Sequence, residues 1–85
     1  MTKAQLRAII SNNVREKRIA AHMNQTELAE ACNTTQARIS LIEGAKAPVD
    51  DELLALFGEI FHVHPATLMM DAGETAKKRN LKVSA

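Results

Sequence analysis

Apolar residues recur along the first 70 residues at the three- and four-residue intervals of amphipathic helices. In the first segment, from about residue 3 to 21, Leu6, Ile9, Ile10 and Val14 keep this spacing. Strand signals are missing, because the chain has neither alternating β-branched runs nor an Asn-Gly or Asp-Gly hairpin turn. The pattern therefore predicts an all-α fold.

A short second helix is predicted by the polar residues at its two ends. Asn24 is a favoured N-cap, and Glu27 three positions later completes a capping box that starts a helix over about residues 25–32. Asn33 tolerates the left-handed backbone conformation that commonly ends a helix. We therefore expect a tight turn at Asn33.

Three further helices are predicted by the same signals, a polar or proline start and apolar spacing. Their expected first or capping residues are Thr34 or Thr35, Asp50 and Pro65. Their expected ranges are about 35–43, 51–61 and 65–70. The chain thus reads as one five-helix domain over residues 1–70, followed over 71–85 by a basic tail that we expect to be flexible.

The second and third helices form the most informative pair in the sequence. Helices this short are not stable alone, so they must pack crosswise on each other and on the first and fourth helices. Crosswise packing needs a small residue where the axes approach, and Ala29 lies there. The apolar anchors are Leu28, Cys32, Ile39 and Ile42. This spacing is typical of a helix-turn-helix.

Three stretches of this pattern resemble the lambdoid phage repressor and Cro family. They are Val14-Arg15-Glu16-Lys17-Arg18-Ile19, Asn24-Gln25-Thr26-Glu27-Leu28-Ala29-Glu30, and Thr34-Thr35-Gln36 with Ile39, Ile42 and Glu43. The resemblance covers about residues 9–70. It implies a compact five-helix, lambda-repressor-like domain that binds double-stranded DNA through its third helix.

The resemblance also implies which residues contact DNA. Asn24 and Gln25 match residues that meet a phosphate, and Lys46 would hold the sugar-phosphate chain from the following loop. The residues expected on the outward face of the third helix, where base edges are read, are Thr35, Gln36, Ala37 and Leu41, with Arg38 and Ser40 at its edges.

The chemistry of this face agrees with base reading. Gln36 can pair bidentately with adenine, and the Thr35 methyl and the Ala37 side chain suit a thymine methyl. Leu41 replaces what is often a polar reader in the family, so the operator sequence cannot be transferred from a relative.

One match and one departure from the family concern the structural frame of the site. Arg18 and Glu43 match a partly buried salt bridge that ties the first helix to the recognition helix. The family usually has glycine two residues after this Glu, whereas here Gly44 follows it directly.

The charge distribution supports a nucleic-acid partner for the first half of the chain. The formal net charge is only +1, but residues 1–46 hold seven Lys and Arg against four Glu, a balance of +3. Residues 47–76 hold six Asp and Glu and no Lys or Arg, and residues 77–85 add four basic residues. A DNA footprint is local, so we look for it in the first half.

Other function classes find little support in the composition. Two Phe, no Trp and no Tyr exclude an aromatic platform for unpaired bases. Cys32 is the single cysteine, so no internal disulfide can form, and His62 and His64 lack the further ligands that zinc needs. We expect no metal, no cofactor and no enzymatic activity, since no nucleophile stands with a plausible base. Without an apolar run of signal or membrane length, we expect a cytoplasmic protein of a bacterial or phage-infected cell.

The expected function is repression by a homodimer on a palindromic operator. The predicted dimer contacts are Phe61, Val63, Leu68 and Met69. Two alternatives remain open: a DNA-binding antitoxin with a toxin partner, and a protein-interaction module that keeps the fold and docks a partner through Ala37 and Leu41. Salt dependence separates DNA binding from an apolar protein contact, because only DNA binding weakens steeply with salt.

Overall fold

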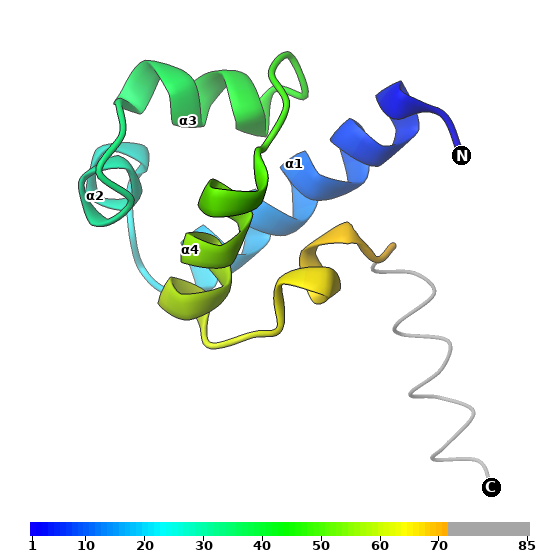
Figure 1. Cartoon of the computed structure of the whole chain (residues 1–85). Coiled ribbons are helices and arrows are strands. Elements are labelled where there is room, and N and C mark those ends of the chain that lie inside the picture. The colour runs from blue at the N-terminus through cyan, green and yellow to red at the C-terminus, as the bar shows by residue number, and fades with distance from the viewer. Residues whose placement is uncertain (72–85) are drawn as a thin grey trace, which may run out of the picture.

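The computed structural model describes residues 1–71, and within them every regular element is helical. The order is α1 (Lys3–Ala20), α2 (Gln25–Ala31), α3 (Gln36–Glu43), α4 (Asp51–Phe61) and a short 3-10 helix, η1 (Pro65–Met69). Figure 1 shows α3 along one edge of the molecule, with α2 beside its start and η1 beside α1. The first four predicted helices are therefore confirmed to within two residues at each end.

The prediction of a fifth α-helix over residues 65–70 is wrong. Residues 65–69 form a 3-10 helix, so the described fold has four α-helices and one 3-10 turn rather than five α-helices. The backbone bonds there run from the Thr67 N–H to the His64 carbonyl and from the Met70 N–H to the Thr67 carbonyl, at the tighter three-residue spacing. A five-residue segment is too short to gain from the α-helical ladder. Residues 72–85 of the predicted tail lie outside the described residues.

Each α-helix begins at the kind of polar residue that the sequence predicts. Asn24 and Glu27 form the expected capping box, with the Glu27 N–H donating to Asn24 Oδ1 at 2.7 Å and the Asn24 N–H to Glu27 Oε1 at 2.9 Å. The other α-helices start at Thr2, Thr35 and Asp50, whose side chains accept a backbone N–H three residues on. Such a cap typically contributes about 1 kcal/mol.

Each α-helix ends in one shared motif. A residue with positive φ follows the last turn, its N–H bonds the carbonyl three residues back, and the next N–H bonds the carbonyl five residues back. This is the Schellman arrangement, which usually uses glycine. Here the four left-handed residues are His22, Asn33, Ala45 and His62, with φ between 54° and 59°. The turn predicted at Asn33 is confirmed. The other three left-handed positions were not predicted, because none of them is occupied by glycine.

The core draws on every element. Its fully enclosed side chains are Val14 of α1, Leu28 of α2, Ile39 and Ile42 of α3, Phe57 of α4 and Leu68 of η1. Burying each large apolar side chain contributes about 1.5–3 kcal/mol, so the two short central helices are stabilised through this shared core. None of the helices among residues 1–71 is long and apolar enough to cross a membrane.

Two buried polar side chains of α1 bind the segments that cover it. Ser11 Oγ donates to the Glu43 carbonyl oxygen at 3.0 Å, at the end of α3. Asn13 Nδ2 donates to the carbonyl oxygens of Leu68 and Met70 at 2.9 and 2.8 Å, which holds η1 against α1. These bonds fix the frame that carries α3 without using any outward-facing residue of that helix.

Candidate nucleic-acid interface

The helix-turn-helix is built from α2, the turn over residues 32–35, and α3. Ala29 is buried where α2 meets α3, as the crosswise packing requires. Thr35 Oγ1 accepts the Arg38 N–H at 3.2 Å and starts α3. The left-handed turn at Asn33 reverses the chain within a few residues, so α2 and α3 pack directly against each other. Both helices contribute side chains to the same core, which supports α3.

The recognition helix α3 has two distinct sides. Ile39 and Ile42 face the core and are fully enclosed. The opposite side is exposed and runs along the free edge of the molecule in Figure 1. Its exposed residues include the expected base readers Thr35, Gln36, Ala37 and Leu41. Leu41 keeps 47% of its surface exposed, so this face is partly apolar.

Four polar side chains from three helices form a connected chain that ends at Gln36. Arg18 Nε and Nη2 donate to the two Glu43 carboxylate oxygens at 2.8 and 3.0 Å, the pair that the sequence analysis expects. Gln25 Nε2 donates to Glu43 Oε1 at 3.3 Å, and Gln25 Oε1 accepts from Gln36 Nε2 at 2.7 Å. The glutamines were predicted as separate contacts, whereas the structure joins them.

These hydrogen bonds leave part of the hydrogen-bonding capacity of the Gln36 side chain unused. A glutamine amide has two N–H donors and one carbonyl acceptor. One donor of Gln36 is used by Gln25, so the second N–H and the carbonyl oxygen remain. Those are the two groups that a bidentate contact to adenine N7 and N6 requires. Gln25 therefore holds the Gln36 amide through one N–H and leaves the other N–H and the carbonyl oxygen without a partner within residues 1–71.

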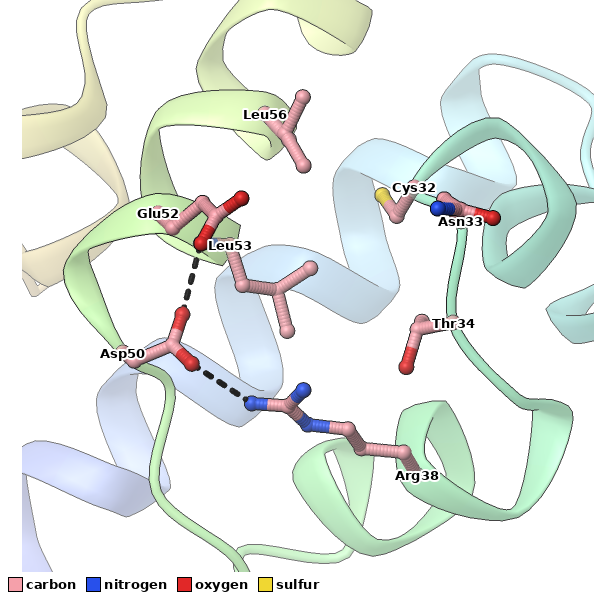
Figure 2. Close-up of a pocket in the computed structure, with 8 residues that line it drawn as sticks. All are labelled: Cys32, Asn33, Thr34, Arg38, Asp50, Glu52, Leu53 and Leu56. Atoms are coloured by element: carbon pink, nitrogen blue, oxygen red, sulfur yellow. Dashed lines mark hydrogen bonds and ion pairs between the residues drawn. The ribbon is translucent and has the colours of Figure 1, made fainter.

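Arg38 lies on the flank of α3 that faces α4. Its Nη2 donates to Asp50 Oδ2 at 3.0 Å across an open hollow of about 200 Å³, which Figure 2 shows together with Cys32 and Leu53. The Leu53 N–H bonded to Asp50, and then the Arg38 guanidinium, lower the pKa of the Asp50 carboxyl. The ion pair ties α3 to the start of α4, and contact of Arg38 with DNA stays a prediction.

The loop after α3 presents Lys46. Gly44 caps the helix with φ −89°, and Ala45, not the glycine, takes the left-handed conformation with φ 59°. The Lys46 N–H bonds the Leu41 carbonyl oxygen at 2.8 Å, which folds the chain back over the helix end. The Lys46 side chain is exposed beside α3, in the region where the sequence analysis expects a sugar-phosphate contact.

The predicted dimer residues do not share one environment. Leu68 is a correction: it is fully enclosed within one chain, because η1 folds back onto α1, so it cannot meet a partner. Phe61 stacks on Phe57 with ring centroids 6.0 Å apart, and Val63 also packs against the core. Met69 is 40% exposed.

The cysteine and the two histidines that could bind a metal or react with an oxidant lie outside the outer face of α3. Cys32, which caps the end of α2, is buried in the core, and burial raises the pKa of its thiol. His64 Nδ1 accepts the Ala66 N–H at 3.1 Å at the start of η1, and His62 ends α4. Among residues 1–71, no three His, Cys, Asp or Glu side chains gather in a metal-binding group.

One basic residue of the site was missed by the sequence analysis. Arg15 of α1 lines a hollow beside α3 together with Arg18 and Ser40. Its position one helical turn before Arg18 places both on one face of α1, and this spacing was the available signal.

The pattern of these residues matches a known family over most of the described chain. The model of the helix-turn-helix family matches residues 14–68. The chain belongs to this helix-turn-helix family. Its membership supports a DNA-binding transcription regulator as the class of function. No curated protein sequence matches the chain significantly.

Two solved structures share the fold. The hypothetical transcription factor NHTF from Neisseria superposes with a TM-score of 0.81 at 22% identity, over 91% of this chain and 88% of that chain. The clp gene regulator ClgR from Corynebacterium glutamicum gives 0.74 at 23% identity, over 93% of this chain and 84% of that chain. At this identity the likeness establishes the fold.

Proposed function

We propose that this protein is a sequence-specific regulator that binds duplex DNA as a homodimer, with α3 of each copy in a major groove. The observation that carries the proposal is the outer face of α3, where Gln36 is exposed and is held by Gln25 through one N–H, with its other N–H and its carbonyl oxygen unpaired within residues 1–71. Two copies would contact half-sites roughly 34 Å apart, one turn of the duplex, on a palindromic operator.

Base reading would combine one polar and several apolar contacts. Gln36 would read adenine through its remaining N–H and its carbonyl oxygen. Ala37 and Leu41 are exposed beside it and suit thymine methyl groups, as does the Thr35 methyl. Each good bidentate pair discriminates by about 1–3 kcal/mol, so Gln36 is the largest single source of specificity in this proposal.

Phosphate contacts would set the register of α3 in the groove. Asn24 is exposed and Gln25 partly buried at the start of α2, before α3, and the exposed Lys46 follows α3. Contacts at both ends fix orientation and carry no sequence information. Arg38 and Ser40 border the face between them.

The biological role we propose is repression by occluding a promoter, in the manner of a phage or prophage regulator acting in the cytoplasm of a bacterial cell. No catalytic step is part of this role. Of the expected dimer contacts, Met69 is the most exposed, with Phe61 and Val63 half-buried near it in the chain, so the proposed dimer surface includes the end of η1.

The deciding experiment is selection of bound duplexes from a random pool at near-physiological salt. We expect a palindromic motif, and we expect Gln36→Ala to relax the preference at one base pair of each half-site. Glu59→Ala on α4 is the matched control, because Glu59 is exposed and lies on another helix, and it should leave the motif unchanged. No enriched motif with the native protein would refute the proposal.

The second candidate function is a protein-interaction module. The 47% exposure of Leu41, next to exposed Ala37, is the observation that favours it, because an apolar surface suits a protein partner. Association that resists salt and fails in Leu41→Asp, together with no selected DNA motif, would establish this alternative.

A further inference from the structure

A hollow of about 220 Å³ lies where α1, α2 and α3 meet. It is lined by Arg15, Arg18, Gln25, Ser40, Glu43 and Gly44. The hollow adjoins the reading face, because Ser40 lies one turn after Gln36 on α3 and Gln25 bonds Gln36 directly. A group seated in it would lie beside the duplex in the proposed complex.

Most polar groups of this hollow are already used. Arg18 is bonded to both Glu43 oxygens and to the Met23 carbonyl oxygen, and Gln25 bonds Glu43 and Gln36. The Glu43 side chain keeps only 4% of its surface exposed, so its charge is both neutralised and covered. The two arginines and this one carboxylate leave the lining with one uncompensated positive charge.

That charge belongs to Arg15. Its side chain is exposed and has no hydrogen-bond or ion-pair partner within residues 1–71. The Ser40 hydroxyl across the hollow, an exposed donor, also has none within the same residues. A cationic fork and a hydroxyl, both without partners, form a site for an anion with several oxygens.

We propose that this hollow holds one phosphate of the DNA backbone, with the Arg15 guanidinium as its main donor and Ser40 as a second. The inference rests on the proposed function. Arginine matches phosphate geometry with two parallel N–H donors, which gives direction as well as charge. A phosphate held here would fix the distance between α1 and the strand that runs past Gln36, so Arg15 acts as a positioning residue and not as a base reader.

The test measures how binding of the selected duplex depends on salt. Each phosphate contact contributes about −0.9 to the slope of log affinity against log salt. The homodimer makes this contact once in each half-site, so Arg15→Gln should make the slope shallower by about 1.8, which makes the loss of affinity between 50 and 200 mM salt about 12-fold smaller. Lys17→Gln is the matched control, because Lys17 lies on the same helix but about 200° around its axis. It should leave the slope unchanged, and neither variant should change the motif.

Single phosphates replaced by neutral methylphosphonate identify the contact. At one position in each half-site, the replacement should weaken binding of the native protein and of Arg15→Lys clearly more than that of Arg15→Gln, in which only the Ser40 contact remains. Equal losses in the native protein and Arg15→Gln at every position, with an unchanged slope, would overturn this inference and leave the proposed function intact. A native protein that selects no duplex would overturn the proposed function itself. Matching thermal unfolding of the variants and the native protein excludes misfolding as the cause.

Discussion

Ala45 adopts a left-handed backbone conformation that is strained for alanine. It takes φ 59° in the turn after the recognition helix, while Gly44 beside it has φ −89°, a value that any residue adopts. The left-handed conformation places Cβ too close to the following carbonyl oxygen and costs roughly 1–2 kcal/mol for alanine. Glycine has no such cost, so Ala45→Gly removes a penalty from the folded state.

The expected net gain follows from two opposing terms. Removing the strain gains roughly 1–2 kcal/mol, while the greater freedom of glycine in the unfolded chain costs about 0.4–1 kcal/mol. We therefore expect Ala45→Gly to raise the free energy of unfolding by about 1 kcal/mol. For a domain of this size that raises Tm by roughly 4–8 °C. Thermal unfolding followed by circular dichroism at the helical band measures it.

A double variant that exchanges Gly44 and Ala45 separates the strain at position 45 from the effect of glycine on the unfolded chain. Gly44→Ala combined with Ala45→Gly keeps the composition, so the unfolded chains are nearly equivalent and the gain should reach about 1–2 kcal/mol. A Cβ on Gly44 would lie 3.3 Å from the Ser40 carbonyl oxygen and 3.7 Å from that of Leu41, so the Ser40 carbonyl must shift by a few tenths of an ångström, and the cost of this shift reduces the gain.

The control for these variants is an ordinary helical alanine. Ala55→Gly, at an exposed position inside α4, should lower the free energy of unfolding by about 1 kcal/mol. If Ala45→Gly melts at or below the native temperature while Ala55→Gly behaves as expected, the reasoning about strain at this turn is wrong.

Three further predictions concern the frame of the site. Glu43→Ala leaves Arg18, whose side chain is 13% exposed, without its ion pair and should cost about 3 kcal/mol in urea unfolding, whereas Arg18→Met combined with Glu43→Met should recover most of this loss. If the double variant is no more stable than Glu43→Ala, the loss has another source. The pKa of Asp50 is lowered from 3.8, mainly by the Leu53 N–H and then by Arg38, so its stabilisation is present above pH 3.8 and is lost as the pH falls through the lower folded value. Asp50→Asn should therefore unfold with a shallower dependence on pH below 3.8, and an unchanged pH profile would contradict this origin. Burial raises the pKa of the Cys32 thiol, so at neutral pH a thiol reagent should label it slowly in the native protein and rapidly in urea, and equal rates would show that the thiol is accessible.

The helix starts could be predicted because their cause is local. A side-chain oxygen at Asn24 or Asp50 bonds an N–H three residues later, and both partners stand in one short stretch of sequence. The helix ends were harder to predict from the sequence, because His22, Ala45 and His62 do not favour positive φ as glycine does. Packing of the following segment imposes that conformation on them. The position of η1 against α1 was also not predictable, since it depends on how Asn13 binds the carbonyls of Leu68 and Met70 from far away in the sequence.

The sequence by itself determined the all-α class, four of the five predicted helices and the helix-turn-helix, because apolar spacing and caps act within one element. The residues expected on the outer face of α3 came from the family resemblance. Only the tertiary structure decided that Gln25 holds Gln36, that Arg38 turns to Asp50, that Leu68 is enclosed, and that Arg15 and Ser40 border one hollow. Each of these depends on where side chains from two or three helices meet. That meeting is set by how the shared core packs, which no single stretch of the chain encodes.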